Sequence, residues 1–368
     1  MSPRHDVRGP VLIVGTGLLG TSLGLALREL GVEVGLQNRS PSSLHLARDL
    51  GAGEPAGPGF QPRLVVVATP PDVIVPHVVA ALRAHPHAVV TDVASVKGGL
   101  AEAVASEVGG AVARFVGSHP MAGRERSGAA AADSDLYQGR TWVICPHATA
   151  DADAVAAVRR LAISVGSLPV VMDAGEHDLA VAAVSHVPQL VASLTATRLA
   201  DLPTEALALA GQGVRDVTRI AASDPMMWSA SLSANARSGL PHAEALLASL
   251  EDVVGALRTA AEEGPGAPGV MKAFAGVIEG GRRGVSRIPG KHGGAARRYA
   301  EVTVFVPDKP GELGRLFAEI GAASVNIEDL RLEHAAGAKL GVATLSVLPA
   351  RVAELTAHLE ELGWRVMA

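Results

Sequence analysis

Short apolar runs alternate with longer amphipathic stretches over the first half of the chain. Apolar runs bounded by Gly, Pro or polar residues predict buried strands, and apolar residues spaced three or four apart predict helices. The predicted strands are residues 11–14, 32–36, 64–68, 88–91, 114–117, 141–145 and 169–172, with helices at 21–30 and 153–165. Strands that alternate with helices indicate a parallel, doubly wound α/β sheet.

The strand pattern stops after Asp173. Helical periodicity continues through residues 176–199, 204–209, 228–238 and 242–262, which predicts an all-helical second domain. Pro188 lies inside the first of these helices and is expected to kink it. The high content of Ala, Leu and Val favours burial of these helices, either against a second subunit or within the domain.

A Gly-rich basic stretch at 280–298 is typical of a flexible linker. Beyond it, strands at 302–306, 326–334, 339–348 and 364–367 and helices at 313–322 and 352–362 are predicted in the order βαββαβ. We therefore expect a sheet domain at 1–172, a helical domain at 173–280, a linker at 281–298 and a small module at 299–368.

A Gly-rich turn joins the first predicted strand to its helix. It reads Gly15-Thr16-Gly17-Leu18-Leu19-Gly20, the GxGxxG order of a dinucleotide site in which the helix N-terminus faces the phosphates. The second strand ends at Asn38-Arg39-Ser40, where NAD enzymes usually carry a carboxylate for the ribose. Asn38 does not repel a 2′-phosphate and Arg39 can pair with one, which favours NADP. The alternative is NAD, with Asn38 on the ribose and Arg39 in solvent.

Thr69, Ser95 and His119 each follow another predicted strand. The carboxyl ends of parallel strands meet at one edge of the sheet, where ligands bind. We expect all three residues to line one crevice with the Gly-rich turn, with Thr69 and Ser95 among the cofactor-binding residues. His119 lies in a Gly/Pro-punctuated loop and can take a proton near neutral pH, so it is the candidate catalytic base.

Two polar clusters interrupt the apolar helices. His186 and Gln189 flank Pro188, and polar groups beside a kink can face a cleft; a buried structural histidine is an equal interpretation of His186. Asp216 and Arg219 are three residues apart and share a helix face. The Arg219 guanidinium suits recognition of a carboxylate, and a surface ion pair is the alternative.

Composition narrows the class of protein. Of 368 residues, 48% are hydrophobic and 19% are charged, which is enough apolar material for folded cores. A net charge of −5 argues against nucleic acid as a partner. The single cysteine, Cys145, excludes an intramolecular disulfide and a Cys-rich metal site, and no residues have metal-ligand spacing. No apolar run before the first strand is long enough for a signal peptide or membrane span, so a cytoplasmic enzyme is expected.

Taken together, these motifs resemble the prephenate/arogenate dehydrogenase family of tyrosine biosynthesis. The matching segments are 15–20, 92–97, 119–123 with Glu125 and Ser127-Gly128, 185–188, and 216–219 through Trp228. They cover the sheet and helical domains. The final module resembles an ACT domain, most clearly at Asp308-Lys309-Pro310-Gly311-Glu312-Leu313. The fold implied is a Rossmann-like domain, a helical dimerisation domain and a ferredoxin-like ACT domain.

The resemblance implies an oxidative decarboxylation with hydride transfer to NAD or NADP. His119 matches the histidine that takes the substrate's C4 hydroxyl proton, and Ser95 matches a serine that bonds both groups. Arg219 matches the arginine on the substrate carboxylate. The full set of implied substrate-binding residues is Arg219, Asp216, Gln189, His186, Glu125 and Trp228, with Glu125 gating the mouth of the site.

Gln189 departs from the Ser-His-x-Pro-His pattern of many prephenate-using members. A histidinium at this position would repel the ammonium of arogenate, whereas the Gln189 carbonyl can accept a hydrogen bond from it. Gln can also donate to the keto oxygen of prephenate. Both substrates stay open, and arogenate is favoured.

The ACT resemblance implies an amino-acid effector, with tyrosine the first candidate and phenylalanine the second, and a homodimer. The Pro310-Gly311 turn places backbone N–H groups at the start of a helix, where a carboxylate can bind. Leu313 and Asn326 complete the predicted effector site, with Asn326 on the ammonium.

Two other functions compete with this one. A dehydrogenase of the 3-hydroxyacid type would need a lysine base in the helical domain, and no lysine occurs between Lys97 and Lys272. A non-catalytic sensor of nucleotides and amino acids would be expected to have lost Ser95, His119 and Arg219, and all three are present.

Overall fold

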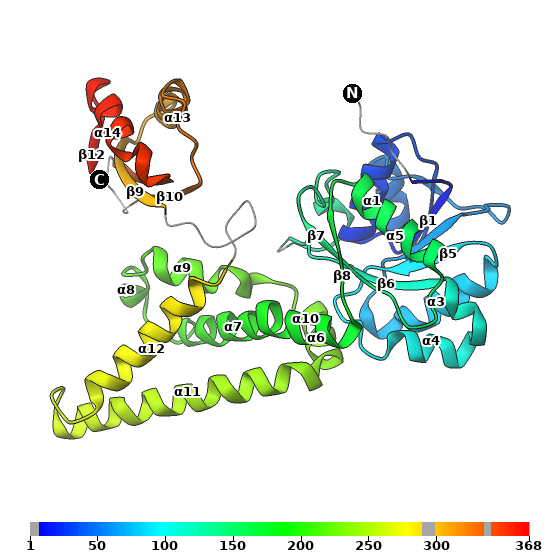
Figure 1. Cartoon of the computed structure of the whole chain (residues 1–368), viewed down its shortest axis with the longest axis horizontal. Coiled ribbons are helices and arrows are strands. Elements are labelled where there is room, and N and C mark those ends of the chain that lie inside the picture. The colour runs from blue at the N-terminus through cyan, green and yellow to red at the C-terminus, as the bar shows by residue number, and fades with distance from the viewer. Residues whose placement is uncertain (1–6, 125, 289–298, 335–339, 368) are drawn as a thin grey trace. The chain divides into compact units, whose positions relative to one another are not determined.

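The structure is a computed structural model that describes residues 7–124, 126–288, 299–334 and 340–367. The chain forms two compact units, Met1–Leu247 and Ala248–Ala368, which we describe one at a time (Figure 1). The boundary between them falls inside the long helix α11 (Ala236–Glu263).

An eight-stranded sheet opens the first unit, in the order β3-β2-β1-β4-β5-β6-β7-β8. Its strands are β1 (Val11–Val14), β2 (Val34–Gln37), β3 (Glu54–Pro55), β4 (Leu64–Val67), β5 (Val89–Asp92), β6 (Phe115–Pro120), β7 (Thr141–Cys145) and β8 (Leu168–Val171). Strands β1 to β6 are parallel, whereas β7 pairs antiparallel with β6 and β8 pairs parallel with β7. The prediction of a wholly parallel sheet is therefore wrong for the last two strands.

The connection from β6 to β7 explains this reversal. Within its described residues, the only helical segment in residues 121–140 is the short 3₁₀ turn Ala129–Ala131. Parallel neighbours need a crossover, usually a helix, whereas an antiparallel neighbour needs only a return loop.

Helices cover both faces of the sheet. They are α1 (Leu18–Glu29), α2 (Pro41–Asp49), α3 (Ile74–Ala84), α4 (Leu100–Val108) and α5 (Ala152–Ser164). Val11 and Ile13 of β1 pack into one apolar core with α1 and α5, and Leu12 and Val14 pack into another with α3 and α4 (Figure 1). The sheet is thus buried on both sides, as the continuous apolar runs predict.

Between β8 and the C-terminal module, the described elements are all helical, which confirms the predicted helical region. They are α6 (Ala174–Val181), α7 (Val187–Leu199), α8 (Thr204–Leu207), α9 (Gln212–Thr218), α10 (Pro225–Ala234) and α11. The kink predicted at Pro188 takes the form of a π-helical segment, Ala182–His186, that joins α6 to α7. A π turn accommodates the missing N–H and the ring of the proline.

The stretch Ala174–Leu199 is also long and apolar enough to cross a membrane by length and composition alone, with a mean hydropathy of 1.5. However, it carries His177, Asp178 and His186, which are buried and hydrogen-bonded to protein groups. Only 28% of the apolar window is buried within this chain, so these three polar residues lie on the packed side of a partly exposed helix.

The second unit contains the end of α11, helix α12 (Val270–Val285) and the C-terminal module. Residues 281–285, expected to be linker, are the last turn of α12. Arg282 and Arg283 lie in that turn, where cations interact favourably with the helix dipole, and Arg282 pairs with Glu279 at 3.0 Å. Residues 289–298 of the predicted linker lie outside the described residues.

The module has the predicted βαββαβ order. Its elements are β9 (Ala300–Pro307), α13 (Glu312–Ala322), β10 (Asp329–His334), β11 (Leu340–Val347), α14 (Val352–Glu361) and β12 (Arg365–Met367). The strands form an antiparallel sheet in the order β10-β11-β9-β12. Alternate residues of β9, such as Val302, Val304 and Val306, bury against both helices.

Candidate active site

The Gly-rich turn has the geometry of a dinucleotide-binding loop. Gly15 has a φ of +105°, and a Cβ there would lie 2.3 Å from the carbonyl oxygen of Ala68. A Cβ on Gly20 would lie 1.9 Å from the carbonyl oxygen of Gly15, so only glycine lets α1 approach the strand. A Cβ on Gly17 would meet no atom within 4 Å, and Gly17 begins α1 without a side-chain cap. Open space in front of uncapped N–H groups fits a diphosphate.

A cluster of hydroxyl and amide groups lies at the end of β2, where a ribose would bind. Asn38 Nδ2 donates to Thr16 Oγ1 at 2.5 Å, and Thr16 Oγ1 lies 3.0 Å from Ser43 Oγ. Ser40 caps α2 by accepting from the Ser43 backbone N–H at 3.4 Å. The structure thus brings Thr16, Asn38 and Ser40 together, with Arg39 exposed beside them.

Thr69, Ser95 and His119 lie at the carboxyl ends of the neighbouring parallel strands β4, β5 and β6. The buried hydroxyl of Thr69 has no hydrogen-bond partner, as expected for a group that awaits a ligand. His119 is not in a loop as predicted: β6 extends to Pro120 because β7 pairs with it, and His119 lies opposite Val143.

A buried ion pair holds the loop after β5. The side chains of Lys97 and Asp92 form a salt bridge with exposures of 1% and 0%. Asp92 also accepts from the backbone N–H of Ala94 at 2.9 Å and of Ser118 at 3.2 Å. This network fixes the segment that carries Ser95 against the strand that carries His119.

His119 contacts a second histidine. Its Nδ1 lies 2.9 Å from Nε2 of His177, and Nδ1 of His177 lies 2.8 Å from the Asp178 carboxylate. Burial lowers the pKa of His119 well below its ordinary value, and the neighbouring His177, Lys97 and His186 lower it further. His119 is therefore neutral at physiological pH and can accept a proton.

The helices after β8 face this edge with further polar groups. Ser95 Oγ donates to Ser231 Oγ of α10 at 3.2 Å. The side chain of Asn235 lies 3.2 Å from Nδ1 of His186 and donates to the Asp178 carbonyl at 2.8 Å. The ring of His186 also packs edge-on against Trp228, with ring centres 5.9 Å apart.

Gln189 is buried, and its orientation is fixed. Its amide Nε2 donates to the carbonyl oxygen of Ile220 at 3.0 Å, and a second contact to Ser193 Oγ is 3.4 Å long. Because a carbonyl can only accept, the NH₂ group must face Ile220, which leaves the Gln189 carbonyl oxygen as an acceptor.

The two candidate carboxylate-binding residues lie in successive elements and not on one helix as predicted. Asp216 lies in α9 and accepts from Gln212 Nε2 at 2.7 Å, whereas Arg219 opens the 3₁₀ segment Arg219–Ala222. Both side chains are exposed. Glu125 lies outside the described residues.

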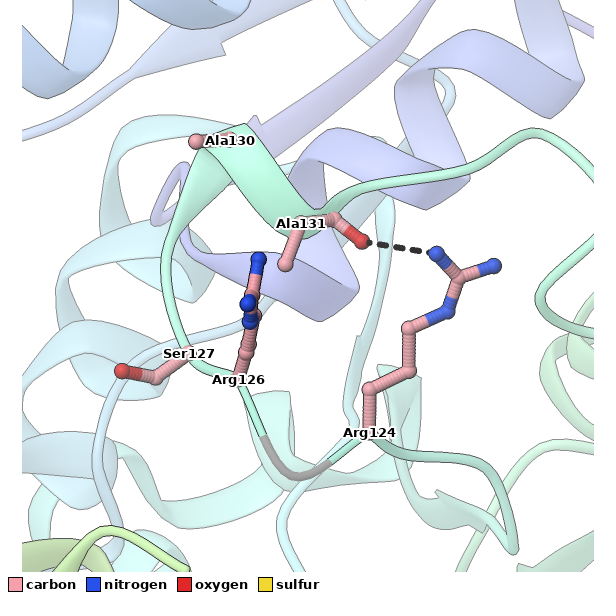
Figure 2. A pocket seen from close by; sticks show the side chains of 5 residues that line it. All are labelled: Arg124, Arg126, Ser127, Ala130 and Ala131. Atoms are coloured by element: carbon pink, nitrogen blue, oxygen red, sulfur yellow. Dashed lines mark hydrogen bonds between the residues drawn. The ribbon is translucent and has the colours of Figure 1, made fainter. Parts of the chain in front are cut away.

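A cavity of about 420 Å³ is lined by Arg124, Arg126, Ser127, Ala130 and Ala131 (Figure 2). Arg124 donates to the Ala131 carbonyl and pairs with Asp133 at 2.6 Å; this hydrogen bond lowers the pKa of Asp133. The turn that carries these alanines packs on α1 and α2, the two helices of the dinucleotide loop and ribose end. One wall of the cavity therefore packs on these two helices, and Arg126 is a second cation of the lining.

A second cavity, of about 240 Å³, lies in the C-terminal module. Its lining residues are Val306, Pro307, Asp308, Lys309, Pro310, Gly311, Leu313 and Leu332. Three of the four predicted effector residues therefore line it. Asn326 does not: it precedes β10 by three residues, contrary to the predicted strand start, and donates to Glu328 Oε1 at 2.7 Å.

Several residues in this region were not predicted from the sequence. They are His177, Asp178, Ser231, Asn235, Arg124 and Arg126. The adjacent pair His177-Asp178 near the start of a predicted helix was the only local signal. Across the described ranges of the chain, no group of three or more His, Cys, Asp or Glu residues is placed to hold a metal ion.

The Gly-rich turn, the half-buried His119 and the polar cluster at the end of β2 are those of a nucleotide-dependent oxidoreductase with a Rossmann-like domain. Residues 23–170 match the nucleotide-binding domain of prephenate dehydrogenase, and residues 173–266 match its dimerization domain. The chain is also 34% identical to the probable prephenate dehydrogenase NovF of Streptomyces niveus, over 96% of this chain and 98% of that protein. The chain belongs to the prephenate dehydrogenase family, which confirms the predicted enzyme class.

Other relatives agree with this assignment. Prephenate dehydrogenase of Bacillus subtilis is 26% identical over 89% of each chain. The crystal structure of prephenate dehydrogenase from A. aeolicus with hydroxyphenyl propionate and NAD⁺ superposes with a TM-score of 0.64 and 28% identity, over 76% of this chain and 99% of that one. Arogenate dehydrogenase of Synechocystis gives a TM-score of 0.59 and 25% identity, over 75% and 99%.

Proposed function

We propose that this chain oxidatively decarboxylates a cyclohexadienol with a ring carboxylate, prephenate or arogenate, in tyrosine synthesis. The observation that carries the proposal is the half-buried His119 at the carboxyl end of β6, next in the sheet to the strand that precedes Ser95, with its pKa lowered by its surroundings. A nicotinamide cofactor supplies the hydride acceptor. His119 takes the C4 hydroxyl proton, Ser95 bonds that hydroxyl, and the ring carboxylate leaves as CO₂.

Arg219 binds a substrate carboxylate in this account, with Asp216 beside it and Glu125 at the mouth. His186 and Trp228 form the wall behind the substrate, supported by their ring contact. Buried hydrogen bonds to Asn235 keep His186 in place before substrate binds.

Arogenate is the favoured substrate. With the Gln189 NH₂ group engaged by the Ile220 carbonyl, the amide oxygen is the group left for a ligand. An oxygen acceptor suits the ammonium of arogenate and opposes the keto oxygen of prephenate.

NADP is the favoured cofactor. No carboxylate stands at Asn38-Arg39-Ser40, and Arg39 is exposed beside Asn38, where its guanidinium can pair with a 2′-phosphate. The proposed cofactor-binding residues are Gly15, Thr16, Gly17, Leu18, Leu19, Gly20, Asn38, Arg39, Ser40, Thr69 and Ser95.

A cofactor-reduction assay with each substrate and each cofactor tests these assignments. We expect the highest kcat/KM with arogenate and NADP. The variant Gln189→His should shift preference towards prephenate, and Ser193→Ala, which removes only the weaker contact of Gln189, is the matched control. No reduction with either substrate would contradict the proposed reaction itself.

The C-terminal module is proposed to be an ACT domain that binds tyrosine, and the match to a dimerization domain supports a homodimer. The cavity at the Pro310-Gly311 turn, where Gly311 begins α13, can hold an amino-acid carboxylate on backbone N–H groups.

We also place the enzyme in the cytoplasm, as for a biosynthetic dehydrogenase.

Tyrosine inhibition of two matched variants tests the effector site. Gly311 and Gly363 have φ angles of +91° and +84°, so valine strains both positions, but only Gly311 lines the cavity. We expect Gly311→Val to abolish inhibition and Gly363→Val to retain it. Equal inhibition in both variants would place tyrosine at the active site as a competing product.

A further inference from the structure

A chain of three side chains leads from the catalytic edge of the sheet into α6. His119, His177 and Asp178 are linked by contacts of 2.9 Å and 2.8 Å. His177 and Asp178 are only 1% and 4% exposed. Neither is among the substrate or cofactor contacts proposed above, so the cost of burying them needs another explanation.

Asp178 is held as a carboxylate. Its Oδ1 accepts from the backbone N–H of Lys97 at 2.8 Å, and its Oδ2 accepts from that of Gly98 at 2.7 Å. Burial acts to raise the pKa of Asp178, but the hydrogen bonds from His177, Lys97 and Gly98 outweigh it and lower the pKa. The charged form therefore persists at neutral pH, and it ties α6 to the loop that carries Ser95.

The proton positions of both histidines follow from this carboxylate. An ionised carboxylate only accepts, so His177 carries its proton on Nδ1. Nε2 of a neutral His177 is then an acceptor, and His119 must donate to it from Nδ1. Across the described residues no hydrogen bond engages Nε2 of His119, whose lone pair is free.

We propose that His177, fixed by Asp178, is a positioning residue that holds His119 as the tautomer with an unprotonated Nε2. The inference rests on the proposed reaction, in which that lone pair takes the substrate proton. Once His119 is charged, its Nδ1–H bond to His177, with the Asp178 charge behind it, stabilises the imidazolium. A doubly protonated His177 would instead donate to His119 and put a second buried cation near Lys97.

Side-chain ¹⁵N chemical shifts test the tautomer directly in the full, unmodified chain. The signals of His119 are identified by their loss in His119→Asn among the 13 histidines. We expect His119 to be protonated on Nδ1 and unprotonated on Nε2 at neutral pH. Protonation on Nε2, or a doubly protonated His177, would overturn the proposal. The result needs no substrate, so it is independent of whether the proposed reaction is correct.

Two variants test the consequence for turnover. His177→Phe keeps a ring but no acceptor, and should lower kcat by about 10- to 100-fold with KM nearly unchanged. His177→Gln offers a carbonyl near the position of Nε2 and should restore most of the lost kcat. Wild-type turnover in His177→Phe, or an equal loss in both variants, would contradict the role; thermal unfolding checks that each variant is folded.

Discussion

The site at the sheet edge and the C-terminal module differ in what they bury. At the sheet edge, His177, Asp178, His186, Gln189 and Asn235 are each at most 5% exposed and hydrogen-bonded. The buried core of the module is apolar throughout: it consists of Val302, Val304, Val306, Leu316, Ile320, Val325, Ala343, Leu345, Val347, Leu355, Leu359 and Trp364.

This difference in buried polar groups suits the sheet edge to chemistry and the C-terminal module to ligand binding. Buried polar groups are costly unless they are paired, so a connected set of them indicates a place where charge must be moved or held. Among the described residues of the module, no polar or charged residue is fully buried as a whole, and the cavity is lined partly by a turn whose backbone can bind a ligand. We expect substitutions at the first region to alter turnover or folding strongly, and comparable substitutions in the module to have small effects on both.

Removing the base should have the largest effect. His119→Asn should lower kcat by about 10²–10⁴-fold, which corresponds to about 2.7–5.5 kcal/mol, because no neutral imidazole is left to take the hydroxyl proton. Cofactor affinity should stay nearly unchanged. His45→Asn, on the exposed surface of α2, is the matched histidine control and should leave kcat at the wild-type value.

Breaking the buried ion pair should have the next largest effect, on stability. Lys97→Met leaves the Asp92 charge buried and unpaired, and should lower the free energy of unfolding by about 3–5 kcal/mol. In the module, Arg331 pairs with Glu301 while both are more than half exposed, so Arg331→Ala should cost less than about 1 kcal/mol. Denaturant unfolding measures both values. Equal losses would remove the contrast between the two regions.

Loss of the carboxylate clamp should mainly weaken substrate binding. Arg219→Ala should raise KM by an amount worth about 1.5–3 kcal/mol if ground state and transition state bind the carboxylate equally. Arg215→Ala, in α9 and also exposed, should leave KM unchanged. An unaltered KM in Arg219→Ala would show that another cation binds the carboxylate.

A substitution at the end of β2 should shift the selectivity between NAD and NADP and leave the catalytic steps unchanged. Asn38→Asp repels a 2′-phosphate and can bond a 2′-hydroxyl, so the ratio of kcat/KM for NAD over NADP should rise about 10-fold or more. Ser42→Asp places the same charge at an exposed position of the neighbouring helix α2 and serves as the control. A constant ratio in Asn38→Asp would mean that the end of β2 does not select the cofactor.

Local sequence patterns were sufficient to predict most helices and strands, and to predict which residues share the sheet-edge side of the site. The apolar runs located the strands, and the parallel order of β4, β5 and β6 brings Thr69, Ser95 and His119 to the same edge. The reversal of β7 was not predictable, because strand direction depends on the connection that follows β6 and not on the composition of β7. The contact between His119 and His177 spans 58 residues and forms only when α6 packs on the sheet edge.

The most direct test of the central claim, that His119 acts as a neutral base at the sheet edge, is the pH dependence of kcat/KM. The base works only when unprotonated, and its pKa lies below 6.5 because of burial and the neighbouring His177, Lys97 and His186. Activity should therefore hold its plateau as the pH falls from about 8 to about 6.5 and decline only at lower pH. A decline centred above 6.5, or an unchanged acid limb in His119→Asn, would contradict the assignment of His119 as the base.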